Sequence, residues 1–83
     1  MKYEAHVEVS LKKGHSDPEG ETTKNSLIEL GYKLTSVKVS KVYQLVLEAE
    51  SFHEAQSEIE EICRRLLANP VKDNYDFRIE EKK

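Results

Sequence analysis

Residues 11–20 read LKKGHSDPEG, and in this stretch a strand ends, a basic loop follows and a helix begins. Asp17 followed by Pro18 is typical of a helix start, because aspartate caps the free backbone amides and proline needs no amide at the first helical position. We expect the helix to run from Pro18 to Leu30, with Gly31 as its left-handed terminating residue. The stretch therefore predicts a strand before it and a helix after it.

The residues before this stretch have the two-residue period of a strand that is buried on one face. Polar side chains alternate with apolar ones from position 3 to position 11. The predicted buried positions are Tyr3, Ala5, Val7, Val9 and Leu11.

Residues 34–50 have the pattern of two strands joined by a tight turn near Ser40 and Lys41. The turn lacks the Asn-Gly or Asp-Gly pair that marks two-residue hairpins. Val42 and Val46 make the middle of the second strand apolar on both faces, so we expect another subunit to cover the outer face there. The alternating apolar positions are Val37 and Val39 in the first strand and Tyr43, Leu45, Leu47 and Ala49 in the second.

A second helix is predicted to begin at Ser51, where Ser51 and Glu54 have the spacing of a capping box. It ends at Asn69, because the residue before Pro70 is disfavoured in the helical conformation. A last strand follows, with Tyr75, Phe77 and Ile79 facing inward. The apolar stripe of this helix consists of Phe52, Ala55, Ile59, Ile62, Cys63 and Leu66.

The predicted order is β-α-β-β-α-β in a single domain, residues 1–83. This order indicates an α+β, ferredoxin-like fold in which two helices cover one face of a four-stranded antiparallel sheet. Gly20 and Thr23 would let the first helix lie close against that sheet. A chain this short, with 35% charged residues and no tryptophan, has little apolar surface to bury, so we expect it to be oligomeric.

Composition argues against several classes of partner. Thirteen basic and sixteen acidic residues are interspersed and give a net charge of -3, which does not favour nucleic acid or an anionic membrane. No apolar run exceeds three residues, far below the roughly 20 that span a bilayer, and no signal peptide is expected. A single cysteine allows no intrachain disulfide and fits the reducing cytoplasm.

RNA binding on this fold would need aromatic side chains on the open face of the sheet. The aromatic residues of the predicted strands are instead in phase with aliphatic residues of the core. These residues are Tyr3, Tyr43, Tyr75 and Phe77.

No catalytic, cofactor-binding or metal-binding residues are predicted. The three histidines share no ligand spacing, Cys63 lies on a buried stripe, and no phosphate-binding glycine loop occurs. Lys12, Lys13 and His15 beside the helix start leave two interpretations open: an anion site, or a solvated basic turn. The capping carboxylate of Asp17 favours the second.

Several short motifs, in order and at these separations, resemble the PurS family over nearly the whole chain. The first are Leu11-Lys12-Lys13-Gly14 and Asp17-Pro18-x-Gly20. The others are Leu27-x-x-Leu30-Gly31-Tyr32 and Leu66-Leu67-Ala68-Asn69-Pro70-Val71, followed by Tyr75.

The resemblance implies the small subunit of phosphoribosylformylglycinamidine (FGAM) synthase, a glutamine-hydrolysing, ATP-dependent carbon-nitrogen ligase complex of purine biosynthesis. It implies a non-catalytic subunit that bridges the PurL synthase and the PurQ glutaminase and assists ammonia transfer. ATP and Mg would bind at PurL, and this chain would form a homodimer or homotetramer. A stand-alone ligand-binding regulatory module on a ferredoxin-like scaffold is the alternative.

Two loops are the expected contact surface for these partners. The residues are Lys12, Lys13, Gly14, His15 and Asp17 in the first loop and Asn69 and Pro70 after the second helix. It stays open at this point whether Gly14, Asp17 and Pro70 serve only as turn and cap residues.

Overall fold

The computed structural model describes every residue from Met1 to Lys83. Its elements are β1 (Lys2–Leu11), α1 (Pro18–Glu29), β2 (Lys41–Glu48), α2 (Phe52–Ile62), the short π-helix η1 (Cys63–Leu67) and β3 (Asp73–Lys82). The predicted α+β class is confirmed, but the sheet has three strands rather than four.

The sheet has the order β2-β1-β3, and β1 is antiparallel to both neighbours. Val7 lies opposite Tyr43 on one side and Phe77 on the other. Facing residues in an antiparallel pair share a face, so the alternating apolar positions of all three strands gather on one side of the sheet. The inward-facing residues predicted for the first and last strands are therefore confirmed.

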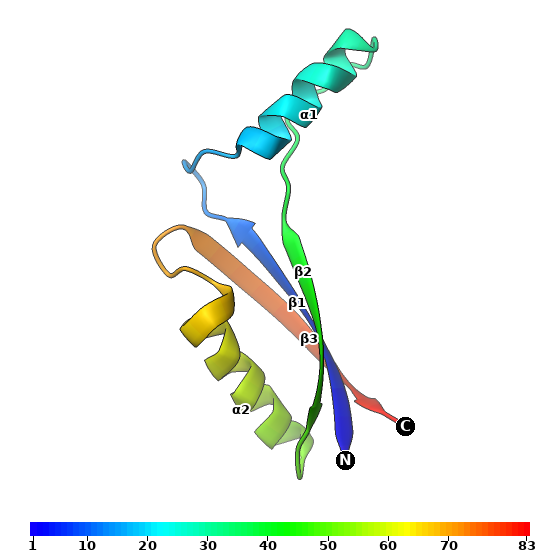
Figure 1. Cartoon of the computed structure of the whole chain (residues 1–83), viewed down its shortest axis with the longest axis vertical. Helices are drawn as coiled ribbons and strands as arrows, with labels where there is room; N and C mark the ends of the chain where they lie inside the picture. Colours follow the sequence, from blue (N-terminus) through cyan, green and yellow to red (C-terminus); the bar gives the residue numbers. More distant parts are fainter.

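Helix α2 covers that side of the sheet (Figure 1). Ser51 Oγ accepts a hydrogen bond from the Glu54 amide at 3.1 Å, which caps the helix where the sequence predicts its start. The sheet-facing side chains of Ala55 and Ile59 in α2 and of Cys63 at the start of η1 are completely buried. These side chains and the inner face of β1 make up most of the core.

The end of α2 differs from the prediction, because it widens into the π-helical turn η1. The Ala68 amide donates to the Cys63 carbonyl at 3.0 Å, five residues back, and the extra residue in this turn rotates the side chains that follow. Ala68 is therefore buried, whereas Leu66 is 81% exposed. The prediction that Leu66 belongs to the core stripe is wrong, and Phe52 at the other end of the stripe is also half exposed.

Helix α1 does not lie on the sheet, contrary to the sequence-based prediction. It projects beyond the end of the sheet, away from α2 (Figure 1), and Gly20 is its only buried residue. The helix offers little apolar surface to hold it on the sheet, since Thr22, Thr23, Asn25 and Ser26 occupy its middle. Only α2 covers the sheet. The predicted end of α1 is confirmed, however, because Gly31 follows the helix with a φ of 102°.

The predicted strand around Val37 and Val39 is also absent. Residues 32–40 run back along α1 and enter β2 without a reverse turn (Figure 1). No Asn-Gly or Asp-Gly pair is present to close a hairpin at Ser40 and Lys41, and the chain passes straight through these positions. We call residues 17–40, which comprise α1 and the returning segment, the arm.

The molecule is elongated and thin, with principal extents of 51 × 29 × 14 Å. Only ten of its 83 residues are buried. Apolar side chains remain exposed on the arm, on the outer face of β2, on η1 and in the loop before β3; the largest exposures are those of Leu30, Tyr32, Val42, Leu66 and Val71.

Candidate partner-binding surface

The two loops expected to contact partners lie together at one end of the sheet. The Lys12 amide donates to the Lys72 carbonyl at 2.6 Å, and Lys12 Nζ donates to the Pro70 carbonyl at 2.9 Å. These bonds join the loop after β1 to the loop before β3. The structure thus brings the predicted residues to one surface, while their binding of partners stays a prediction.

The loop after α2 is held by its own polar side chains. Asn69 Oδ1 accepts from the Val71 amide at 2.9 Å, and Asp73 Oδ2 accepts from the Asn69 amide at 2.9 Å. The Asn69 carbonyl accepts from the amides of Lys72 and Asp73. Asn69 therefore shapes the loop, and it presents Pro70 at the surface.

Both carboxylate oxygens of Asp17 accept hydrogen bonds within the arm. Oδ1 accepts from the Gly20 amide at 3.0 Å, as expected of a helix cap, and Oδ2 accepts from the Val39 amide at 2.9 Å. The Val39 bond, followed by the Gly20 bond, lowers the pKa of Asp17 below its ordinary value. Asp17 therefore fastens the returning segment to the start of α1, which gives it a structural role beyond capping.

Gly20 makes that contact sterically possible. A Cβ atom at this position would lie 2.5 Å from the Val37 carbonyl oxygen and 2.6 Å from Asp17 Oδ2. Only a residue without a side chain lets the two parts of the arm approach so closely. The prediction of a close approach at Gly20 is correct, although its partner is the returning segment rather than the sheet.

Lys13 and His15 are the predicted contact residues whose side chains are free. Both are exposed and make no hydrogen bond or ion pair within the chain. Gly14 between them has a φ of 91° and nothing within 4 Å of a built Cβ, so the turn needs glycine for its backbone rather than for space.

Three further lysines gather at the same end of the molecule, and the sequence reasoning missed them. Lys38, Lys41 and Lys72 line the hollows between the first loop, the arm and the end of the sheet, the larger of which measures about 330 Å³. They come from separate segments, so only the folded arrangement places them together. We define the basic end as Lys12, Lys13, His15, Lys38, Lys41 and Lys72; none of these side chains forms an ion pair in the structure.

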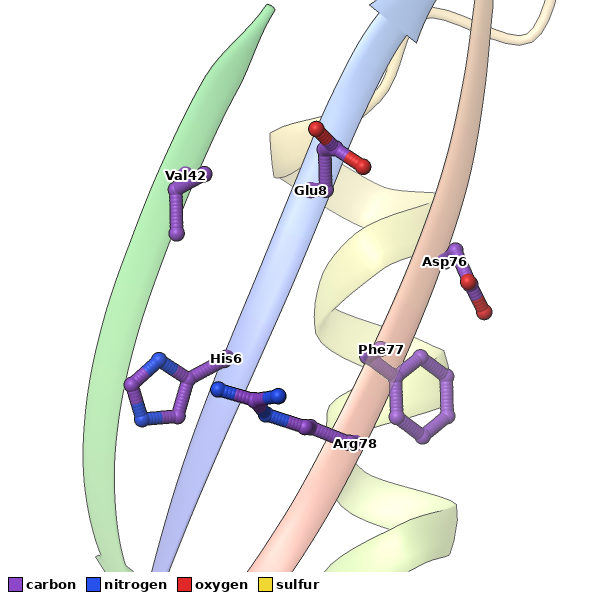
Figure 2. Close-up of a pocket in the computed structure, with 6 residues that line it drawn as sticks. All are labelled: His6, Glu8, Val42, Asp76, Phe77 and Arg78. Atoms are coloured by element: carbon purple, nitrogen blue, oxygen red, sulfur yellow. The ribbon is translucent and has the colours of Figure 1, made fainter.

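The outer face of the sheet carries another hollow of about 310 Å³ (Figure 2). His6 and Glu8 of β1 and Arg78 of β3 project from this face, and Arg78 extends toward His6 in the close-up. His6 Nε2 and Lys82 Nζ each lie 3.2 Å from the carboxylate of Glu4. These two contacts, that of His6 first, lower the pKa of Glu4. The Lys82 contact thus ties β3 to β1 on this polar face, while the His6 contact lies within β1.

The aromatic side chains of the strands lie on the opposite, α2-covered face, as predicted. Tyr3 is buried, and Tyr43, Tyr75 and Phe77 are partly buried against the core. The Tyr75 hydroxyl donates to Glu60 at 2.7 Å, and this bond raises the pKa of Tyr75. The outer face therefore offers no stacked aromatic platform for bases.

Reactive side chains are sparse in this chain. Cys63 is completely buried, and burial, followed by the nearby Glu60 carboxylate, raises the pKa of its thiol, which disfavours the nucleophilic thiolate. No group of three or more His, Cys, Asp or Glu side chains is arranged to hold a metal ion. None of the helices is long and apolar enough to cross a membrane.

These features define a small α+β protein whose candidate functional surface consists of exposed loops and a projecting arm. The family model for PurS, phosphoribosylformylglycinamidine (FGAM) synthase, matches residues 4–81. This chain belongs to the PurS family, and the resemblance inferred from its motifs is confirmed.

Individual relatives agree over most of their lengths. The phosphoribosylformylglycinamidine synthase subunit PurS of Archaeoglobus fulgidus is 47% identical over 74 residues, which are 88% of this chain and 92% of that protein. The structure of Thermus thermophilus PurS matches all of both chains with a TM-score of 0.90 and 34% identity. The structure of PurLQS from Thermotoga maritima matches 96% of this chain and 99% of its own with a TM-score of 0.87 and 28% identity.

Proposed function

We propose that this chain is the PurS subunit of an FGAM synthase complex, and that it acts there as a non-catalytic assembly subunit joining the PurL synthase to the PurQ glutaminase. The observation that carries the proposal is the family match over residues 4–81, together with the likeness to a chain of the solved PurLQS structure. In this proposal glutamine hydrolysis and ATP- and Mg-dependent amidation take place on the other subunits, in the cytoplasm. This chain would assist ammonia transfer only by holding them together.

The basic end is the proposed contact surface for one of these partners. Lys13 and His15 extend into solvent from a loop whose backbone is fixed by Lys12, and neither side chain has a partner within the chain. The unpaired lysines of the basic end favour an acidic patch on the partner, which would steer association and set the orientation. Gly14, Asp17 and Asn69 would act by shaping the surface rather than by touching the partner.

Reconstitution tests the assembly role directly. Glutamine-dependent FGAM formation is measured with purified PurL and PurQ, with and without this chain, and the mixture is examined by gel filtration. We expect activity and co-elution to depend on this chain. Equal activity in its absence would refute the proposal and would favour a stand-alone regulatory module.

A double substitution tests the surface. Lys13→Ala combined with His15→Ala should weaken binding to the partner subunits by about tenfold, because it removes two unpaired surface groups from the contact. Lys2→Ala combined with His53→Ala is the matched control, since it removes one exposed lysine and one exposed histidine elsewhere on the molecule. Equal binding by the two double variants would show that the basic end is not the contact surface.

We also propose that this chain self-associates. Ten buried residues form a small core for a chain of 83, and exposed apolar side chains remain on the arm and on β2. Burial of such surface is the main source of stability that a second copy can add.

A further inference from the structure

The two most exposed large apolar side chains of the molecule lie on η1 and in the loop before β3. Leu66 is 81% exposed, and Val71 is 75% exposed. η1 and this loop follow each other at the end of the sheet where the loop after β1 also lies (Figure 1). Single exposed apolar residues are common on protein surfaces, so the question is whether the structure holds these two in place.

The π-helical turn η1 brings Leu66 to the surface. In a regular helix, position 66 would follow Ile59 and Cys63 on the buried stripe. The wider turn instead places Ala68 in the core and turns Leu66 outward. Turns of this kind are rare, and they occur frequently at functional sites. The chain thus keeps an uncommon turn that exposes a leucine where a regular helix would bury it.

The loop that carries Val71 is held by hydrogen bonds on both sides of this residue. The Val71 amide donates to Asn69 Oδ1 at 2.9 Å, and the amides of Lys72 and Asp73 donate to the Asn69 carbonyl at 3.2 and 2.8 Å. None of these bonds covers the Val71 side chain, which stays exposed. A side chain presented by a preorganised loop loses little conformational freedom when a partner binds.

Val71 lies within the basic end rather than apart from it. Its neighbours Pro70 and Lys72 each accept a hydrogen bond from Lys12 through their carbonyls, at 2.9 and 2.6 Å. Leu67, the last residue of η1, lines the same hollow of about 330 Å³ as Lys72. The end of η1, the loop before β3 and the unpaired lysines therefore form one continuous surface.

We infer that Leu66 and Val71, which we call the apolar anchor, form the centre of the contact that the basic end makes with its partner subunit. The matching surface on that subunit is an apolar pocket bordered by carboxylates. Protein interfaces combine an apolar centre with a polar rim, and here the lysines of the basic end supply the rim. The inference rests on the proposed function and states the chemistry of the partner's surface.

Binding kinetics test the apolar anchor. Leu66→Ala is combined with Val71→Ala, and binding of the chain to PurL, to PurQ and to their mixture is measured by surface plasmon resonance at low and at high salt. The double variant should bind about 10- to 100-fold more weakly, mainly through faster dissociation, because apolar contacts act on the bound state. Its salt dependence should match that of the unmodified chain, since no charge is removed.

Two further double variants make this result specific. Val42→Ala combined with Val46→Ala removes two exposed apolar side chains from the outer face of β2, on the other side of the sheet from α2, and should bind like the unmodified chain. Lys13→Ala combined with His15→Ala removes a rim charge, so it should slow association and reduce the salt dependence. Melting curves show that each variant is folded.

A pair of charged substitutions tests the carboxylate border. Leu66→Lys and Leu66→Glu both remove the apolar contact, but only glutamate repels neighbouring carboxylates. Leu66→Glu should therefore bind at least about tenfold more weakly than Leu66→Lys. Equal binding by these two variants would overturn the acidic border of the partner's pocket.

The remaining outcomes separate the anchor from the proposed function. If the Leu66→Ala, Val71→Ala variant binds as tightly as the β2 control while the unmodified chain binds its partners, the anchor is wrong and the assembly role stands. If the unmodified chain binds neither PurL, PurQ nor their mixture, the assembly role and the anchor are both wrong.

Discussion

Gly20 is the residue on which the integrity of the arm depends most. An added methyl group would meet the Val37 carbonyl and the Asp17 carboxylate at distances that real Cβ atoms essentially never show. In an ordinary helix interior, replacing glycine by alanine is stabilising, because alanine loses less conformational freedom. Here the steric conflict reverses the sign.

We therefore predict that Gly20→Ala destabilises the protein by about 1–3 kcal/mol, the usual cost of overpacking a filled site. Thermal or urea unfolding measures the change. Thr22→Ala, at an exposed position two residues further along the same helix, is the control and should be neutral or slightly stabilising. A Gly20→Ala variant as stable as Thr22→Ala would contradict the tight contact between α1 and the returning segment.

Asp17 gives the arm a dependence on pH. Hydrogen bonds from the Val39 and Gly20 amides lower the pKa of Asp17 in the folded state, so its carboxylate binds a proton less readily there than in the unfolded chain. The stabilisation is complete above the unfolded pKa, near pH 4, and is lost as the pH falls through the lower folded value. Acid should therefore release the returning segment from α1.

The corresponding prediction concerns the fall in melting temperature between pH 6 and pH 3. The fall should be smaller in Asp17→Asn than in the unmodified chain, because asparagine has no proton to gain. Glu19→Gln removes a carboxylate from the same turn that makes no side-chain hydrogen bond, and it should leave the fall unchanged. If both substitutions change the pH dependence equally, Asp17 has no special role in it.

At the scale of the elements, the sequence predicted correctly the features that depend on residues close together in the chain. The alternation of β1 and β3, the Asp17 and Ser51 caps and the left-handed Gly31 are all found where the sequence places them. The π-turn at Cys63 left no local signal, and it moved Leu66 outward. The predicted hairpin at Ser40 is absent. Strand pairing depends on contacts that are distant in sequence, and without an Asn-Gly pair the residues near Ser40 are compatible with either a turn or a straight chain.

For the candidate surface, the sequence predicted the two loops but not their contact. Lys12 reaches Pro70 across 58 positions of sequence, and no periodicity encodes such a distance. The same holds for Lys38, Lys41 and Lys72, which join the basic end only through the path of the arm.

At the scale of the whole molecule, a thin chain with ten buried residues should obtain much of its stability from the second copy. Anything that binds the folded state alone makes the melting temperature depend on concentration. For a dimer of chains this size, a hundredfold dilution should lower the melting temperature by about 5–10 °C. Scanning calorimetry at high concentration and circular dichroism at low concentration measure the shift, and a melting temperature that is independent of concentration would show that the chain folds alone.

Substitutions at two exposed leucines test whether the arm is the part of the molecule that self-associates. Leu30 is 74% exposed at the end of α1, and Leu66 is 81% exposed on η1, outside the arm. If the apolar surface of the arm takes part in self-association, Leu30→Glu should lower the melting temperature and shift dissociation to higher concentration, because it puts a charge into that surface. Leu66→Glu adds the same charge outside the arm, so it should keep the concentration dependence of the unmodified chain. The reverse result, with Leu66→Glu disrupting the dimer and Leu30→Glu leaving it intact, would move the interface from the arm to the face that carries η1.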